Sequence, residues 1–223
     1  MMKKIILFSL LVFLSTIIQA QSFEGKIVFN VTINGIDDPQ ASAMLPKEAT
    51  AYFKGTKSRM EMSLMMGMKN VTITDGATNK STTLMDLMGN KYAIDNSTDK
   101  TTEESKKLYE SAKVSITNEK KKIAGYTCTK AIVEFPSLTN KGQTEKIEMW
   151  FTKELSLNKS YANGPMSKID GSVLEFNINQ GAFVMNLSAK EVLKQNVSDE
   201  LFIVPSNYKI MTADELKKSL GGQ

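Results

Sequence analysis

The sequence predicts a mainly β protein, built as one antiparallel curved sheet or half-barrel with one or two short covering helices. Apolar and polar side chains alternate with a period of two along most of the chain, which is typical of strands with one buried face. Turn-forming dipeptides interrupt the alternation about every 8–12 residues, which indicates neighbouring strands joined by short turns. Patterns typical of helices are confined to two short stretches.

Strands are expected where this alternation lies between turn residues. The first is the clearest, because the apolar side chains from Phe23 to Ile33, with Phe29 among them, share one face before the Asn34-Gly35 turn. Lys120–Lys122 is expected to be a solvated turn, and Leu201–Val204 a short apolar plug. Further strands are predicted over residues 50–54, 57–66, 70–75, 80–87, 91–95, 113–117, 126–135, 143–152, 173–179 and 183–192.

Two segments have the signature of a helix start. Thr101 and Glu104 have the spacing of a capping box and precede apolar residues, so residues 99–112 are expected to form a short helix or a flexible loop. Thr212 and Glu215 have the same spacing and predict a helix at the end of the chain. Either helix could cover one face of the sheet.

Residues 1–20 predict a signal peptide. Two lysines form a basic start, an apolar run from Ile5 to Ile18 follows, and Gln19-Ala20 supplies the small residue at which a signal peptidase cuts. An apolar run of this length is too short to cross a bilayer about 30 Å thick as a helix. The remaining residues, 21–223, are therefore expected to form a single β-rich domain that is periplasmic or secreted.

The composition excludes several kinds of catalytic site. The chain has no histidine, so a device that pairs Ser or Cys with His cannot form, and the commonest ligand of zinc, copper and iron is missing. Cys128 is the only cysteine, so no intramolecular disulfide is possible, and the residue is expected to be a small buried hydrophobe. Because position 21 is Gln21 rather than cysteine, no lipoprotein anchor is expected.

The charge balance gives no sign of a nucleic-acid partner. The chain carries 28 Lys+Arg and 24 Asp+Glu, and Arg59 is the only arginine. Proteins that bind nucleic acids usually concentrate basic residues on one face and use the planar fork of arginine on phosphates and bases. We therefore expect no nucleic-acid partner, and we also expect no cofactor, no metal and no membrane span.

Five short motifs stand out in the predicted β-rich domain. They are Ile123–Ala131, Tyr52–Gly55 followed by Lys57 and Arg59, Glu148–Glu154, Gly171 with Leu174-Glu175, and Val204–Lys209. Together these motifs resemble a family of secreted domains found mainly in Bacteroidetes (domain of unknown function 4412). The resemblance covers most of the expected mature chain and implies no established activity.

A second resemblance rests on the order of features from Lys54 to Gly76. A lysine-glycine turn is followed by Arg59 on a strand, and then by a strand that ends at Asp75-Gly76. This order is similar to that in periplasmic lipoprotein carriers of the LolA/LolB type. The resemblance implies a half-open barrel, closed by helices over an apolar cavity for acyl chains, with Arg59 helping to hold the lid. The chain differs from these carriers in its many methionines and its lack of aromatic residues in the middle strands.

Methionines cluster in and just after the predicted strand 57–66. Methionine is unbranched and polarizable, so it can repack around apolar ligands of variable shape. The cluster is therefore predicted to form one wall of an adaptable pocket; a flexible core and a Cu(I) site with soft thioether ligands are the alternatives. The predicted ligand-binding residues are Met60, Met62, Met65, Met66, Trp150, Phe29 and Arg59.

These observations favour non-catalytic binding of an apolar or amphipathic ligand, such as a lipid or the acyl chains of a lipoprotein. The first alternative is a structural or interaction module of the cell envelope, whose apolar face docks a partner protein. The second is a hydrolase that uses two carboxylates, which requires two acids about 5–10 Å apart in a cleft. No pair of acids in the sequence marks such a cleft, so this hypothesis ranks last.

Overall fold

The computed structural model describes most of the chain after the predicted signal peptide. The segment 1–20 lies outside the described residues, as does residue 21. The described ranges are 22–38, 40, 45–63, 69–87, 89–96, 107–137, 142–159, 164–179 and 183–219.

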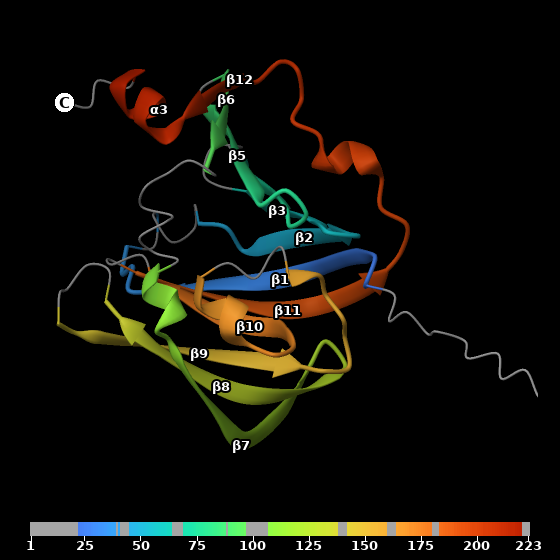
Figure 1. The fold of residues 1–223 in the computed structure, drawn as a ribbon, viewed down its shortest axis with the longest axis vertical. Coiled ribbons are helices and arrows are strands. Elements are labelled where there is room, and N and C mark those ends of the chain that lie inside the picture. Colours follow the sequence, from blue (N-terminus) through green and yellow to red (C-terminus); the bar gives the residue numbers. More distant parts are fainter. Residues whose placement is uncertain are drawn as a thin grey trace, which may run out of the picture.

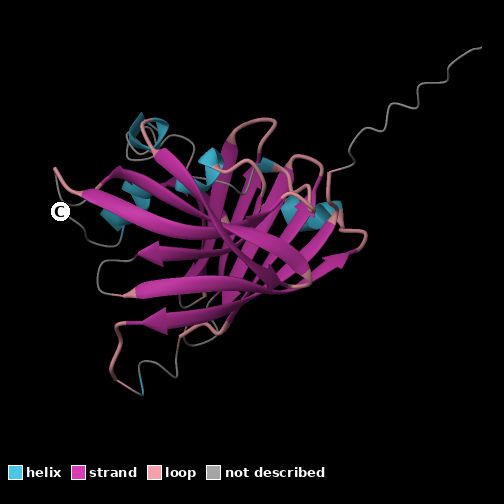
Figure 2. Cartoon of the chain, turned by 90° about the horizontal axis from the view of Figure 1, so that it is seen from below, coloured by secondary structure: helices cyan, strands magenta, loops and turns pink. Residues whose placement is uncertain are grey.

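The structure is mainly β, as the alternation predicts, and its strands form one open, curved sheet of 12 strands. Figure 2 shows this sheet as a twisted, curved layer. The strands are β1 (Gly25–Asn34), β2 (Glu48–Lys54), β3 (Lys57–Ser63), β4 (Lys69–Asp75), β5 (Lys80–Leu87), β6 (Asn90–Asp95), β7 (Lys113–Ile123), β8 (Tyr126–Pro136), β9 (Thr144–Thr152), β10 (Ser172–Asn179), β11 (Val184–Lys194) and β12 (Lys209–Thr212).

The strand order is β12-β6-β5-β4-β3-β2-β1-β11-β10-β9-β8-β7. Strands β1 to β6 follow one another as an antiparallel meander on one side of β1, and β7 to β11 return as a second meander that ends beside β1 on its other side (Figure 1). Strand β12 then pairs with β6 in parallel. The connection from β11 to β12 must therefore run from the middle of the sheet to one of its edges.

One face of the sheet carries the main hydrophobic core, and we call it the inner face. Along β1 every second side chain, including Ile27 and Phe29, is buried on this face. Strands β2, β8, β9, β10 and β11 contribute to the same cluster. Phe29 contacts Phe176 edge to face, with ring centroids 6.2 Å apart, an arrangement that aromatic pairs favour.

The opposite, outer face carries a smaller apolar patch that the chain itself covers. The patch consists of Val71, Ile73, Leu84 and Ala93 on β4, β5 and β6, packed against Val197 and Phe202 from the connection between β11 and β12. We call this connection, residues 195–208, the strap. It contains the short 3₁₀ helix η4 (Asp199–Phe202) and follows the outer face upward to β12 in Figure 1. Burying a side chain such as Phe202 contributes about 1.5–3 kcal/mol.

The predicted strands are confirmed wherever the structure describes them, with small differences at their ends except for β7, which was expected over 113–117 and extends to Ile123. The turn predicted at Lys120–Lys122 is wrong. These lysines lie in β7 and pair with β8, and the turn comes later, at Ala124 and Gly125, where φ is positive. Strand β7 lies at the end of the strand order, so consecutive lysines can reach water from either face. Lysine is common at sheet edges because it opposes edge-to-edge aggregation.

The two predicted helices have different outcomes. Residues 107–110 are helical, whereas 97–106 lie outside the described residues. The terminal helix α3 (Ala213–Ser219) is confirmed together with its capping box. The backbone N–H of Thr212 donates to Glu215 Oε2 at 2.7 Å, and the N–H of Glu215 donates to Thr212 Oγ1 at 3.2 Å. None of its residues is buried, so α3 is not a packed cover of the core.

A short 3₁₀ helix, η3 (Gly164–Lys168), precedes β10.

Strand β12 was not predicted, because four residues are too few to display a period of two. It exists through its pairing with β6, which places Met211 opposite Ile94 on the inner face. Both side chains are buried.

We predict that Gly25→Ala strongly destabilises the fold. A β carbon at Gly25, where φ is +155°, would lie 2.1 Å from the carbonyl oxygen of Leu193 and 2.7 Å from the ring of Phe23. Displacing this backbone and ring should cost on the order of 3 kcal/mol, measured as the free energy of unfolding in urea. Gly55→Ala is the control, because its β carbon meets no atom within 4 Å and only the positive φ of +55° is strained. That control should lose about 1 kcal/mol, and equal losses in both variants would contradict the packing argument.

Candidate functional site

The inner face brings three of the predicted site residues, Phe29, Met60 and Met62, into two adjacent rows across neighbouring strands. Phe29 on β1 pairs with Ala49 on β2, which pairs with Met62 on β3. In the adjacent row, Ala51 on β2 pairs with Met60. Paired residues of an antiparallel sheet point to the same face. The small alanine side chains thus stand between the methionines of β3 and the large side chains of Phe29 and Ile27 on β1.

The exposure of these side chains differs in a way that matters for binding. Phe29 is almost completely buried, with 1% of its surface exposed. Met60 and Met62 pack against the core cluster but stay only partly buried. Phe29 is therefore a core residue, whereas the two methionines form the border of the core. Met65 and Met66, predicted for the same wall, lie outside the described residues.

Arg59 lies on the outer face, because neighbouring residues of a strand point to opposite faces and Met60 points inward. Its Nε donates to Glu61 Oε1 at 2.6 Å, and one terminal nitrogen donates to the carbonyl oxygen of Leu201 in the strap at 2.7 Å. Only 14% of the Arg59 side chain and 25% of the Glu61 side chain are exposed. The planar guanidinium presents a separate nitrogen to each acceptor in a fixed geometry, whereas a lysine has only one nitrogen.

Two further side chains fasten the strap at its start. Lys54 Nζ donates to the carbonyl oxygen of Val197 at 3.0 Å and to Asp199 Oδ2 at 2.8 Å. Glu24 Oε1 accepts the backbone N–H of Val197 at 2.9 Å. The hydrogen bond with Lys54 lowers the pKa of Asp199 and raises that of Lys54. The sequence predicts Lys54 only as part of a lysine-glycine turn, because no local pattern signals a contact across 145 positions.

Trp150 is partly buried and packs against the main core cluster. It lies between the buried residues Met149 and Phe151 on β9, so its ring points to the other side of the strand. Lys121 Nζ lies 4.3 Å from the centre of the ring and 2.7 Å from Glu175 Oε1. Trp150 therefore does not share a surface with Met60 and Met62, and the predicted site residues are divided between two faces of the sheet.

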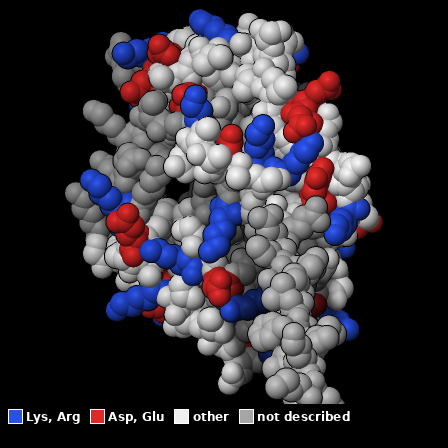
Figure 3. Space-filling model, turned by 45° about the vertical axis from the view of Figure 1, so that its right-hand side comes forward, with Lys and Arg blue, Asp and Glu red and all other residues white. Residues whose placement is uncertain are grey.

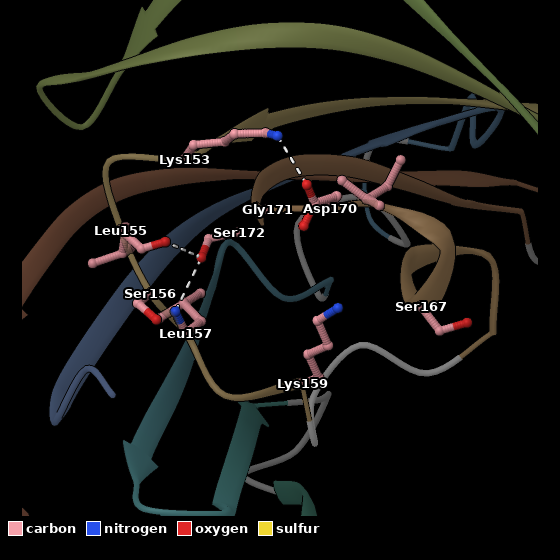
Figure 4. Close-up of a pocket in the computed structure, with 10 residues that line it drawn as sticks. Lys153, Leu155, Ser156, Leu157, Lys159, Ser167, Asp170, Gly171 and Ser172 are labelled. Carbon is pink, nitrogen blue, oxygen red and sulfur yellow. Dashed lines mark hydrogen bonds and ion pairs between the residues drawn. The ribbon is translucent and has the colours of Figure 1, made fainter. Parts of the chain in front are cut away.

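A small open pocket of about 250 Å³ lies at the end of β9, beside the turn into β10. Figure 4 shows Lys153 and Asp170 facing each other across its rim, with Nζ and Oδ2 2.8 Å apart. This contact with Lys153 lowers the pKa of Asp170. Lys159 also lines the pocket. Because Asp170 already neutralises one lysine, the pocket carries little net charge for a ligand to complement.

The floor of this pocket is a fixed part of the fold. The hydroxyl of Ser172 donates to the carbonyl oxygen of Leu155 at 2.6 Å and accepts the N–H of Leu157 at 3.0 Å (Figure 4). Both leucines belong to the main core cluster. The volume is small for an apolar ligand of drug size, since such sites usually measure about 300–1,000 Å³.

Few of the described side chains could act as a nucleophile or bind a metal. Cys128 is fully buried, as predicted. Burial raises the pKa of its thiol to about 11, and the nearby Glu154 carboxylate adds to the effect. A thiol of that pKa is a poor nucleophile at neutral pH, because the thiolate is the reactive form. Within the described ranges, no three Cys, Asp or Glu side chains come together as a metal site.

Acidic and basic side chains are mixed on the surface. On the face that Figure 3 presents, Lys and Arg alternate with Asp and Glu, and a hollow opens at mid-height. Charged residues also pair across strands, for example Lys190 with Glu48 at 2.8 Å. Among the helices of the described residues, none has the length and apolar character needed to span a membrane.

Residues 23–173 match the family model described as Domain of unknown function (DUF4412). The chain belongs to the DUF4412 family. Among solved structures it is similar to lipoprotein LppX of Mycobacterium tuberculosis, with 10% identity over 78% of this chain and 89% of that chain, at a TM-score of 0.42. It is also similar to LprF from Mycobacterium bovis, with 11% identity over 83% and 90% of the two chains, at a TM-score of 0.36. Both scores are low, and no curated protein matches the chain.

The DUF4412 match covers only part of the arrangement described above. It includes the inner-face residues of β1 to β5 and also Arg59. It ends at residue 173, before β11 and before the strap whose Leu201 carbonyl Arg59 binds. In this DUF4412 chain the family region therefore supplies Met60, Met62 and Arg59, and the residues after it supply the cover of the outer patch.

We predict that Arg59→Lys loosens the strap. Lysine keeps the charge but replaces the two separately placed nitrogens of Arg59, Nε and a terminal nitrogen, by a single one, so the variant should lose about 2 kcal/mol of unfolding free energy. Limited proteolysis should also cut residues 195–208 faster than in the parent protein. Ser63→Ala, at an exposed position of the same strand, is the control and should change stability by less than about 0.5 kcal/mol. Unchanged stability and proteolysis in Arg59→Lys would show that the strap does not depend on this contact.

Proposed function

We propose that this protein is a non-catalytic binding protein for an apolar or amphipathic ligand, such as a lipid, in the periplasm or outside the cell. The ligand lies against the inner face at β3, next to Met60 and Met62. Residues 1–20 are the signal peptide that directs the single β-rich domain, residues 21–223, to this location. In this proposal the protein has no nucleic-acid partner, which its paired surface charges support, and it does not itself span a membrane.

The observation that carries the proposal is the partial burial of Met60 and Met62 at the border of the core. Their thioether side chains are large, flexible and apolar, and they stand beside the small side chains of Ala49 and Ala51. Such a surface can adjust to apolar ligands of different shape. Met65 and Met66 follow β3 in the sequence after Leu64 and belong to the same wall in this proposal.

The free energy gained by burying an apolar chain on such a surface is comparable to the cost of association. Each buried methylene contributes about 0.8 kcal/mol, so on the order of ten methylenes would contribute about 8 kcal/mol. Association costs about 4–15 kcal/mol in lost freedom, depending on how rigid the partners are. A single acyl chain of ordinary length is therefore near the lower limit for useful affinity, and a ligand with two chains is bound more firmly.

The residues of the outer face have indirect roles in this proposal. Arg59 does not touch the ligand; it holds the strap, which covers the apolar patch behind the binding wall. Trp150 stays with Lys121 and Glu175 on the outer surface. Phe29 supports the wall from within the core. Of the predicted site residues that the structure describes, only Met60 and Met62 are proposed to contact the ligand directly.

A second function, the docking of a partner protein in the cell envelope, is favoured by a different observation. Val114 and Ile116 on β7 are 37% and 63% exposed, and among the described strands none pairs with the outer edge of β7. An unpaired edge with apolar side chains can accept a strand of another protein. The bulge between Ile116 and Lys120 interrupts this edge, which is why the docking function ranks second.

The direct test is mass spectrometry of lipids extracted from protein purified out of its native compartment. We expect lipid in an amount that approaches one molecule per protein. Protein that yields no lipid, and that also takes up no fluorescent fatty acid after purification, would rule out the carrier function and leave the docking function.

We also predict that Met62→Glu weakens the uptake of a fluorescent fatty acid by about tenfold or more, because a carboxylate would stand unpaired against the apolar chain. The sheet should stay folded, since the side chain is only partly buried. Ser63→Glu is the matched control, because it adds the same charge at the next residue, which is exposed and points to the outer face. Equal uptake by the two variants would remove Met62 from the binding wall.

A further inference from the structure

The inner face changes its chemistry between β3 and β4. Met62 pairs with Asn70, and Met60 pairs with Thr72. One strand further, Asn70 pairs with Met85, and Thr72 pairs with Thr83. Neighbouring strands of a sheet lie about 4.7–4.9 Å apart. Hydroxyl and amide groups therefore begin one strand from the methionine wall and continue on the next.

No charged side chain stands on the inner face of these two strands. Alternation places their charged residues on the outer face instead, where Leu84 and Ile73 mark that face by their packing under the strap. The inner face of β4 and β5 therefore carries hydrogen-bonding side chains but no charged ones. The inner-face residues are Asn70, Thr72, Thr74, Ser81, Thr83 and Met85, and the charged residues are Lys69, Asp75, Lys80 and Asp86.

The polar groups nearest the methionines are available to a ligand. Within the described part of the chain, the side chains of Asn70 and Thr72 make no hydrogen bond to another residue, and both are only partly buried. Thr83 Oγ1 accepts the side-chain N–H of Asn96 at 2.9 Å. That contact orients the Thr83 hydroxyl and leaves its own hydrogen to be donated.

We propose that Asn70, Thr72 and Thr83 form a subsite for the uncharged polar head group of an amphipathic ligand whose apolar chain lies on Met60 and Met62. This inference rests on the proposed function and names the ligand class for the same site. The head group carries hydroxyl, ester or amide groups, as in a glycerol ester. A carboxylate, phosphate or quaternary ammonium head group would lose water here without meeting an opposite charge, which disfavours it.

The test compares head groups on one chain length. Monolauroylglycerol, laurate and dodecyltrimethylammonium are titrated into the purified, delipidated protein at pH 7.4, below their micelle concentrations, and binding is measured by isothermal calorimetry. We expect monolauroylglycerol to bind about tenfold more tightly than either charged probe, the size of effect that a few lost hydrogen bonds produce.

The variant Thr72→Val with Thr83→Val removes both hydroxyls at nearly constant volume. We expect it to lower the affinity for monolauroylglycerol about tenfold and to leave that for laurate unchanged. Thr82→Val is the matched control, because Thr82 lies on the same strand as Thr83 but points to the outer face. Where the double variant does not fold, the ranking of the three probes on the parent protein decides.

The outcomes separate the two proposals. Equal affinity for all three probes, or tighter binding of a charged probe, would overturn the head-group subsite while the binding function stands. Loss of laurate and monolauroylglycerol binding to the same extent in the double variant would also overturn it, because the residues would then be merely structural. Failure of every probe to bind the parent protein would overturn both the subsite and the proposed function.

Discussion

A single curved sheet can enclose only one of its two faces, and this constraint governs the rest of the structure. The inner face from β8 to β2 encloses the main core. The same curvature leaves Val71, Ile73, Leu84 and Ala93 on the outer face without cover from the sheet itself. Val197 and Phe202 of the strap cover this patch, and the chain then continues into β12 at the edge of the sheet.

Strand β3 connects the two faces. Arg59 and Glu61 point outward and hold the strap through the Leu201 carbonyl, while Met60 and Met62 point inward at the border of the core. The alternation of a strand therefore assigns adjacent residues to separate tasks, one structural and one proposed for binding. Arg59 is the only arginine of the chain. It lies where a planar group with several hydrogen-bond donors contacts both Glu61 and the Leu201 carbonyl.

The agreement between sequence and structure follows the range of the interactions involved. The strands, the capping box of α3 and the burial of Cys128 depend on alternation and local hydrogen bonds, and these are confirmed. The turn predicted at Lys120–Lys122 failed because a run of lysines resembles a turn when the edge position of the strand is unknown. The polar surface of Asn70, Thr72 and Thr83 was not predicted, since it becomes continuous only when the register between β4 and β5 is known.

The sequence by itself determined that the protein is mainly β, that it lacks histidine chemistry and intramolecular disulfides, and that it carries the motifs of the DUF4412 family. These properties reside in composition and in short-range periodicity. Only the tertiary structure decided that Arg59 and Trp150 lie on the other face from Met60 and Met62, and that the strap of residues 195–208 covers the outer patch. The physical reason is that strand pairing and the return of a distant segment depend on contacts between residues far apart in the chain, which no local pattern encodes.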